Sequence, residues 1–107
     1  MSPPDMREVL EQAQQMQAKV AQVQRKLALR KFEGSAGGGM VTAEATGELR
    51  VTKVNIEADL LASGDREMLQ DLIAAAVNAA LASAQRTAQE EFQRISGGLG
   101  LGLPGLG

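Results

Sequence analysis

The sequence predicts an α+β fold with a long N-terminal helix, a three-stranded antiparallel meander and a long C-terminal helix. Over about the first 30 of 107 residues, apolar side chains recur at steps of three and four, as on one face of a helix. The middle, residues 32–57, is rich in β-branched residues and glycine-containing turns. Helical spacing returns over residues 65–96. Because the strands follow one another without an intervening helix, we expect them to pair antiparallel.

The first helix is expected from about Asp5 to Lys31. Ser2 can cap it, and prolines suit a first turn whose N–H groups lack partners. Such a helix is roughly 40 Å long, which is more than a small sheet covers, so part of it should project. Its apolar residues form a heptad seam of the kind found in coiled coils: Met6, Val9, Ala13, Met16, Val20, Val23 and Leu27.

Three strands are expected in the middle of the chain. They are Phe32–Ser35, Met40–Thr46 and Leu49–Glu57, separated by the Gly34–Gly39 stretch and a Gly47-Glu48 turn. In the last strand the alternation of apolar residues slips between Val51 and Val54. This slip predicts either a bulge near Thr52-Lys53 or a strand that is buried on both faces.

The second helix is expected from about Asp65 to Ser96, with an alanine-rich apolar stripe that lets the first helix pack closely against it. Residues 1–96 are therefore predicted to form a single domain. Residues 97–107 are rich in Gly, Leu and Pro and are predicted to be a disordered tail. A signal peptide or a membrane span is not recognisable, so a cytoplasmic protein is expected.

The composition argues against an enzyme. The chain has no His and no Cys, which removes the imidazole base, the thiolate nucleophile and Cys/His zinc ligands. Gly34–Gly39 has the glycine spacing of a phosphate-binding loop, but Met40-Val41 stands where Lys-Ser/Thr is required. We therefore expect no catalytic residue, no cofactor, no metal site and no small-molecule substrate.

A run of positive charge is the strongest candidate for a binding site. Lys19, Arg25, Lys26, Arg30 and Lys31 lie within 13 residues that contain no acid, although the whole chain carries a net charge of −2. On an ideal helix, Lys19, Lys26 and Arg30 fall within roughly 40° of one another beside a stripe of glutamines. Such a face suits a phosphate backbone. The alternative is an ordinary solvated helix face whose positive end complements the helix dipole.

A homodimer is the expected assembly. Two long helices over three short strands bury little surface for each residue, and aromatic residues make up 2% of the chain. A three-stranded sheet also leaves unpaired backbone groups at both edges. Joining two sheets about a two-fold axis would cover both deficits.

Several segments together resemble the YbaB/EbfC family of nucleoid-associated proteins. These segments cover nearly the whole chain and are Ala13-Gln14-Gln15-Met16-Gln17, Gly37-Gly38-Gly39, Val54-Asn55-Ile56, Leu60-Leu61 and residues 67–80 from Glu67 to Ala80. The resemblance implies a small bacterial protein whose protomers pair through their sheets and leave helix pairs projecting like tweezers. It also implies DNA binding, association with the nucleoid and effects on gene expression. Together with the basic run, it leads us to expect binding to double-stranded DNA mainly through phosphate contacts, with little or modest sequence preference.

The resemblance places the DNA contacts on the projecting helices. The implied contact residues are Arg7, Arg86 and Arg94 near the free ends, and the five cations from Lys19 to Lys31 nearer the sheet. Ala58 departs from the family, which often has proline there. A rival interpretation is a protein-interaction module of the DNA-recombination or repair machinery that binds no DNA itself, using the projecting helices or the Gly/Leu tail.

Overall fold

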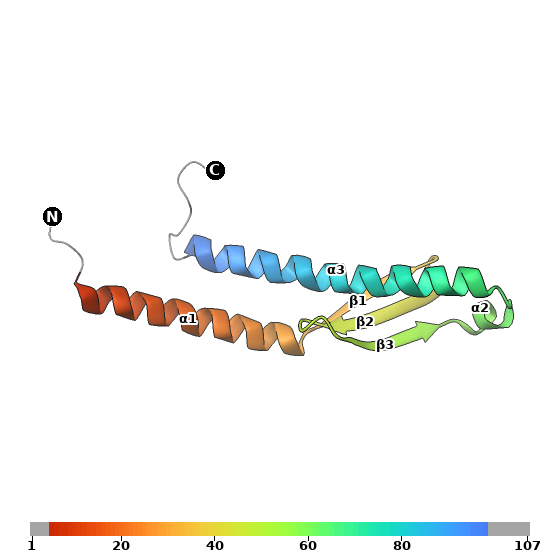
Figure 1. Ribbon diagram of the computed structural model, residues 1–107, viewed down its shortest axis with the longest axis horizontal. Coiled ribbons are helices and arrows are strands. Elements are labelled where there is room, and N and C mark those ends of the chain that lie inside the picture. The colour runs from red at the N-terminus through yellow and green to blue at the C-terminus, as the bar shows by residue number, and fades with distance from the viewer. Residues whose placement is uncertain (1–4, 99–107) are drawn as a thin grey trace.

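The computed structural model describes residues 5–98, which form an elongated molecule measuring 73 × 29 × 15 Å. Two long helices run side by side in opposite directions, and a small sheet lies at one end of the pair (Figure 1). This arrangement confirms the predicted order of long helix, three strands and long helix. The elements are α1 (Met6–Leu29), β1 (Lys31–Ala36), β2 (Val41–Thr46), β3 (Val51–Ile56), α2 (Ala58–Ala62) and α3 (Arg66–Gly98).

Helix α1 starts with a side-chain cap and ends two residues before the predicted position. The Asp5 carboxylate accepts a hydrogen bond from the backbone N–H of Arg7 at 3.3 Å and so satisfies one of the unpaired donors of the first turn. At the other end, Arg30 adopts an extended backbone with φ −76° and ψ 142°. Lys31 then belongs to β1, so the helix does not reach it as expected.

The sheet has the order β1-β2-β3 with antiparallel pairing throughout. Its register shifts between β2 and β3, where Glu44 pairs with Lys53 while the neighbouring Ala45 pairs with Val51. Thr52 is thus the extra residue of a bulge, and its hydroxyl donates to the Glu44 carboxylate at 2.9 Å. Of the two alternatives for this strand, the bulge is confirmed, since Val51 to Asn55 are all exposed.

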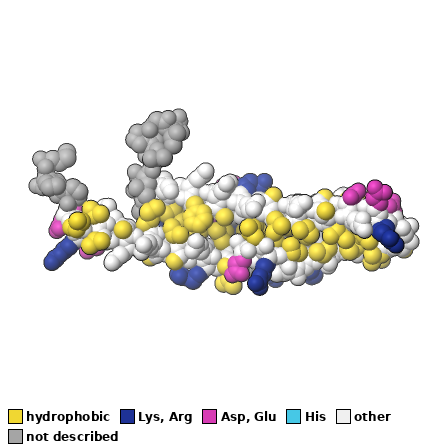
Figure 2. Space-filling view, viewed as in Figure 1, with side chains coloured by type: hydrophobic (Ala, Val, Ile, Leu, Met, Phe, Trp, Pro, Cys, Tyr) yellow, Lys and Arg dark blue, Asp and Glu magenta, His cyan; other side chains and the backbone are white. Residues whose placement is uncertain are grey.

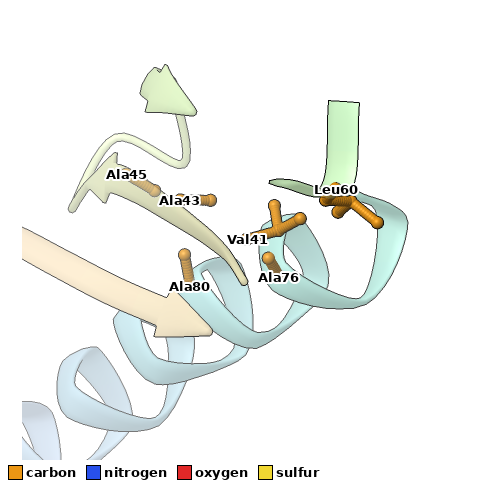
Figure 3. Packing of buried hydrophobic residues seen from close by; sticks show 6 residues of the cluster. All are labelled: Val41, Ala43, Ala45, Leu60, Ala76 and Ala80. Carbon is orange, nitrogen blue, oxygen red and sulfur yellow. The ribbon is translucent and has the colours of Figure 1, made fainter. Parts of the chain in front are cut away.

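Helix α3 covers one face of β1 and β2. Gly34 makes this possible, because a Cβ at this position would lie 2.3 Å from the backbone nitrogen of Ala80. The core between helix and sheet is small and mostly alanine. It consists of Val41, Ala43, Ala45, Leu60, Ala76 and Ala80 (Figure 3).

A second, smaller cluster joins the two long helices where α1 leaves the sheet. Leu27, Phe32 and Ala84 are buried there, with Val23 and Ala88 packed around them. Further along α1 the seam becomes exposed in steps: Met16 and Val20 are half-buried, whereas Met6 is 72% exposed. The expectation that part of the first helix projects is therefore confirmed.

Two details of the second half differ from the prediction. The link after β3 contains a short helix, α2, whose Leu60 is buried in the main core. Helix α3 continues through Gly97 and Gly98, two residues into the segment expected to be a tail. The remainder of that segment, residues 99–107, lies outside the described residues, as does Ser2.

Candidate nucleic-acid interface

The basic run begins on the solvated surface of α1. Lys19, Arg25 and Lys26 are exposed helical residues, and within residues 5–98 none of the three has a carboxylate partner in an ion pair. Lys19 and Lys26 are seven residues apart, which places them on one side of the helix about 10 Å apart along its axis. They form a short, uncompensated row of positive charge.

Arg30 and Lys31 continue the run but do not lie on the helix. The Arg30 guanidinium lies 5.2 Å from the centre of the Phe32 ring, a cation–π contact. Lys31 extends to within 3.9 Å of the Glu44 carboxylate, although its side chain remains largely exposed. The stripe expected on one helix is thus Lys19 and Lys26, with Arg30 beyond the helix end.

Lys26 and Arg30 are brought together in a recess between the helices. This recess of about 240 Å³ is lined by Val23, Lys26, Leu27, Arg30 and, from α3, Glu91. Glu91 also forms an ion pair with Arg94, with 3.3 Å between the charged atoms. The ion-pair partner of Glu91 thus lies on α3 itself, and within residues 5–98 no ion pair joins Glu91 to Lys26 or Arg30.

The three cations expected at the free ends lie in different surroundings. Arg7 is exposed in the first turn of α1, close to the acidic residues Asp5, Glu8 and Glu11. Arg94 is engaged with Glu91 on its own helix. Arg86 does not lie near a free end, because it lines a groove with Gly47 of the β2–β3 turn, beside the sheet.

Sequence reasoning missed three cations: Arg50, Lys53 and Arg66. Arg50 ends the β2–β3 turn, and Lys53 lies on the sheet face that α3 leaves uncovered, opposite Glu44. The sequence signal for these residues was the uneven distribution of charge along the chain. Residues 19–53 hold seven cations and three acids, whereas residues 57–71 hold five acids and one cation.

This division of charge is also a division in space. On the face shown in Figure 2, acidic side chains gather at the α2 end with a cation close by, and further cations lie around the middle and at the free end of α1. An anionic polymer would be repelled by the α2 end and attracted to the region where α1 leaves the sheet. The basic middle is thus the candidate interface.

An apolar surface lies next to the basic middle. Val51 and Val54 of β3 pair with Ala45 and Ala43, so they belong to the α3-facing side of the sheet. Helix α3 packs mainly on β1 and β2, however, and leaves Val51 and Val54 42% and 38% exposed. We call the exposed side of β3 formed by Val51 and Val54 the β3 shelf.

The described residues offer little for other kinds of chemistry. Among residues 5–98 there is no group of three acidic side chains arranged to hold a metal ion. The search for membrane spans over the same residues found no helix with the length and apolarity required. Base stacking has little support, because the chain contains two Phe and neither Tyr nor Trp.

Known proteins are similar to this chain over almost its whole length. Residues 1–99 match the YbaB/EbfC DNA-binding family. A nucleoid-associated protein of Acetivibrio thermocellus is 46% identical over 98 residues, covering 92% of this chain and 86% of that protein. Another from Syntrophobacter fumaroxidans is 44% identical and covers 91% of each chain. The crystal structure of an uncharacterized protein of Helicobacter pylori, 19% identical, has the same fold, with a TM-score of 0.74 over 87% of this chain and 98% of that chain.

Proposed function

Because the chain belongs to the YbaB/EbfC DNA-binding family, we propose that it holds duplex DNA mainly through phosphate contacts with little sequence preference. The family and the names of the relatives make it a nucleoid-associated DNA-binding protein and not an enzyme. Through such contacts it would affect nucleoid organisation and gene expression in the bacterial cytoplasm. The observation that supports the phosphate contacts is the uncompensated positive charge of Lys19, Arg25 and Lys26 on α1.

The arrangement of these cations favours phosphates over bases. Lys19 and Lys26 point from one side of a rigid helix, and a lysine ammonium binds phosphate as a point charge without reading base edges. Arg25 follows on an adjacent face, and Arg30 is held against Phe32 at the helix end. Contacts of this kind fix the orientation of a protein on the duplex and contribute affinity on any sequence.

We propose that the working form is a homodimer joined through the β3 shelf. Val51 and Val54 are apolar, partly exposed and next to an open sheet edge, which is the type of surface a second protomer covers. Replacing both with Glu should give a monomer in sedimentation equilibrium, because the paired carboxylates would be buried against each other. Lys53→Glu is the matched control, because Lys53 lies on the opposite face of the same strand. A monomeric wild-type protein at micromolar concentration would contradict the dimer.

A mobility-shift titration on duplex DNA over a range of salt tests the phosphate contacts. The Lys19→Gln, Lys26→Gln, Arg30→Gln triple variant should bind more weakly on every sequence. Its logarithmic salt slope should fall by about one unit for each cation that contacts a phosphate. The Arg7→Gln, Arg86→Gln, Arg94→Gln variant removes the same charge and should change binding less.

The two triple variants separate the possible outcomes. If the second variant loses more affinity than the first, the main DNA contacts lie among Arg7, Arg86 and Arg94 and not on the basic run of α1. If the wild-type protein produces no shift at low salt, direct DNA binding is wrong. The protein-interaction module of the recombination machinery then becomes the better interpretation.

A further inference from the structure

The turn between β2 and β3, residues Gly47–Leu49, touches both long helices. The backbone N–H of Gly47 donates a hydrogen bond of 2.9 Å to the carbonyl oxygen of Leu27 in the last turn of α1. That oxygen also accepts from the N–H of Arg30 at 3.1 Å. Carbonyl groups in the last turn of a helix have no partner within the helix, so the turn acts as a cap supplied from elsewhere in the chain.

The backbone of Gly47 packs directly against the backbone of Leu27. A Cβ at this position would lie 1.9 Å from the Leu27 oxygen and 2.3 Å from its carbonyl carbon. The φ of Gly47 is not positive, so a left-handed backbone does not account for the glycine here. Only the position of α1 therefore requires glycine here.

The other end of the turn faces α3 and is strained. Leu49 has a φ of 63°, a left-handed conformation that is unfavourable for a bulky side chain. Its side chain lines a groove of about 610 Å³ together with Ala84, Ala88 and Phe92 of α3. A glycine would relieve the strain but would leave α3 without this neighbour. The turn is thus inserted between the helices at the point where they diverge from the sheet.

We propose that Gly47–Leu49 is a spacer that sets the angle between α1 and α3 and so positions Lys19 and Lys26 on the DNA. A single extended residue, Arg30, links helix α1 to the sheet. The direction of α1 therefore depends on the contacts that its last turn makes. The effect on DNA rests on the proposed function, whereas the spacing of the helices does not.

A small displacement at the last turn of α1 produces a larger displacement further along the helix. An alanine at position 47 must push Leu27 away by more than about 1 Å to remove the overlap. Gln15 lies 12 residues further along the helix, or about 18 Å. A tilt that pivots near Arg30 would therefore move Gln15 by several ångström.

Spin labels can measure this movement directly, because the chain has no cysteine of its own. Gln15→Cys on α1 and Gln93→Cys on α3 are both exposed and would carry the labels. Labelled chains diluted in unlabelled chains would report the distance within one protomer. Gly47→Ala should shift or broaden the distance distribution, and Leu49→Gly should broaden it without loss of stability.

Gly64→Ala is the control for a general loss of stability. Gly64 has a φ of 71°, and a Cβ added there would have no atom within 4 Å, so alanine strains the chain without touching either helix arm. Its distance distribution should match that of the wild-type protein. In mobility-shift titrations of Gly47→Ala, Lys19 and Lys26 of the displaced α1 should no longer reach phosphates. The logarithmic salt slope should therefore fall by about two for each protomer.

Unchanged distances in folded Gly47→Ala and Leu49→Gly variants would overturn the spacer. Changed distances with an unchanged salt slope would overturn its role in positioning the cations. If the wild-type protein fails to bind DNA, the proposed function is wrong, and the spin-label distances alone then decide whether the turn spaces the helices.

Discussion

Replacing Gly34 with alanine should strongly destabilise the fold. The added Cβ would lie 2.3 Å from the Ala80 nitrogen, 2.4 Å from the Ala76 oxygen and 2.8 Å from the carbonyl carbon of Ala79. All three atoms belong to the backbone of α3, so a change of side-chain rotamer cannot relieve the overlap. The helix must move away from β1 and open the layer that contains Ala76 and Ala80. Overpacking of this kind costs up to about 3 kcal/mol.

Urea denaturation followed by far-ultraviolet circular dichroism would measure the loss, since the chain has no Trp for fluorescence. With a slope of about 1.5 kcal/mol per molar urea, the midpoint should fall by up to about 2 M. Both proteins must be compared at one protomer concentration, because the proposed dimer would make the midpoint depend on concentration. Gly97→Ala, a helical position with nothing within 4 Å, should leave the midpoint unchanged or raise it slightly. A Gly34→Ala midpoint within about 0.3 M of the wild-type value would refute the close seating of α3 on β1.

Two further predictions concern the core and the start of α1. Val41→Ala should lower the free energy of unfolding by about 2 kcal/mol in the same assay, because Val41 is completely buried. Val9→Ala, at an exposed position of α1, should lower it little. Equal losses in the two variants would contradict the assignment of Val41 to the core. Asp5→Ala should speed hydrogen exchange in the first turn of α1 by about fivefold through loss of its cap. Asp5→Asn should preserve the slow exchange, and fast exchange in both variants would assign the effect to charge instead.

The basic and acidic parts of the chain have separate roles in this interpretation. The net charge of −2 hides a basic segment of residues 19–53 and an acidic segment of residues 57–71. In the proposed complex, an acidic region at the α2 end would limit the surface on which DNA can lie and would orient the molecule toward the duplex. The overall charge is therefore a poor guide to what the protein binds.

Local patterns in the sequence were sufficient for the order of elements. The steps of three and four along α1 predict a helix because each apolar residue returns to the same side. The slipped alternation in β3 predicts the bulge because side chains in a strand change face at every residue. The run from Lys19 to Lys26 predicts a basic helix face without any long-range contact. These properties depend on neighbours in the chain, which a sequence displays directly.

The tertiary structure decided what depends on distant segments. Helix α1 stops at Leu29, where the N–H groups of Gly47 and Arg30 donate to the carbonyl of Leu27, and β1 begins at Lys31 after one extended residue. Arg86 lies beside the β2–β3 turn and not at a free end, because the middle of α3 passes that turn. Gly34 and Gly47 look in the sequence like ordinary loop or strand glycines. Only the packing of α3 and α1 against them shows that each position excludes a Cβ, because steric exclusion requires the second backbone to be in place.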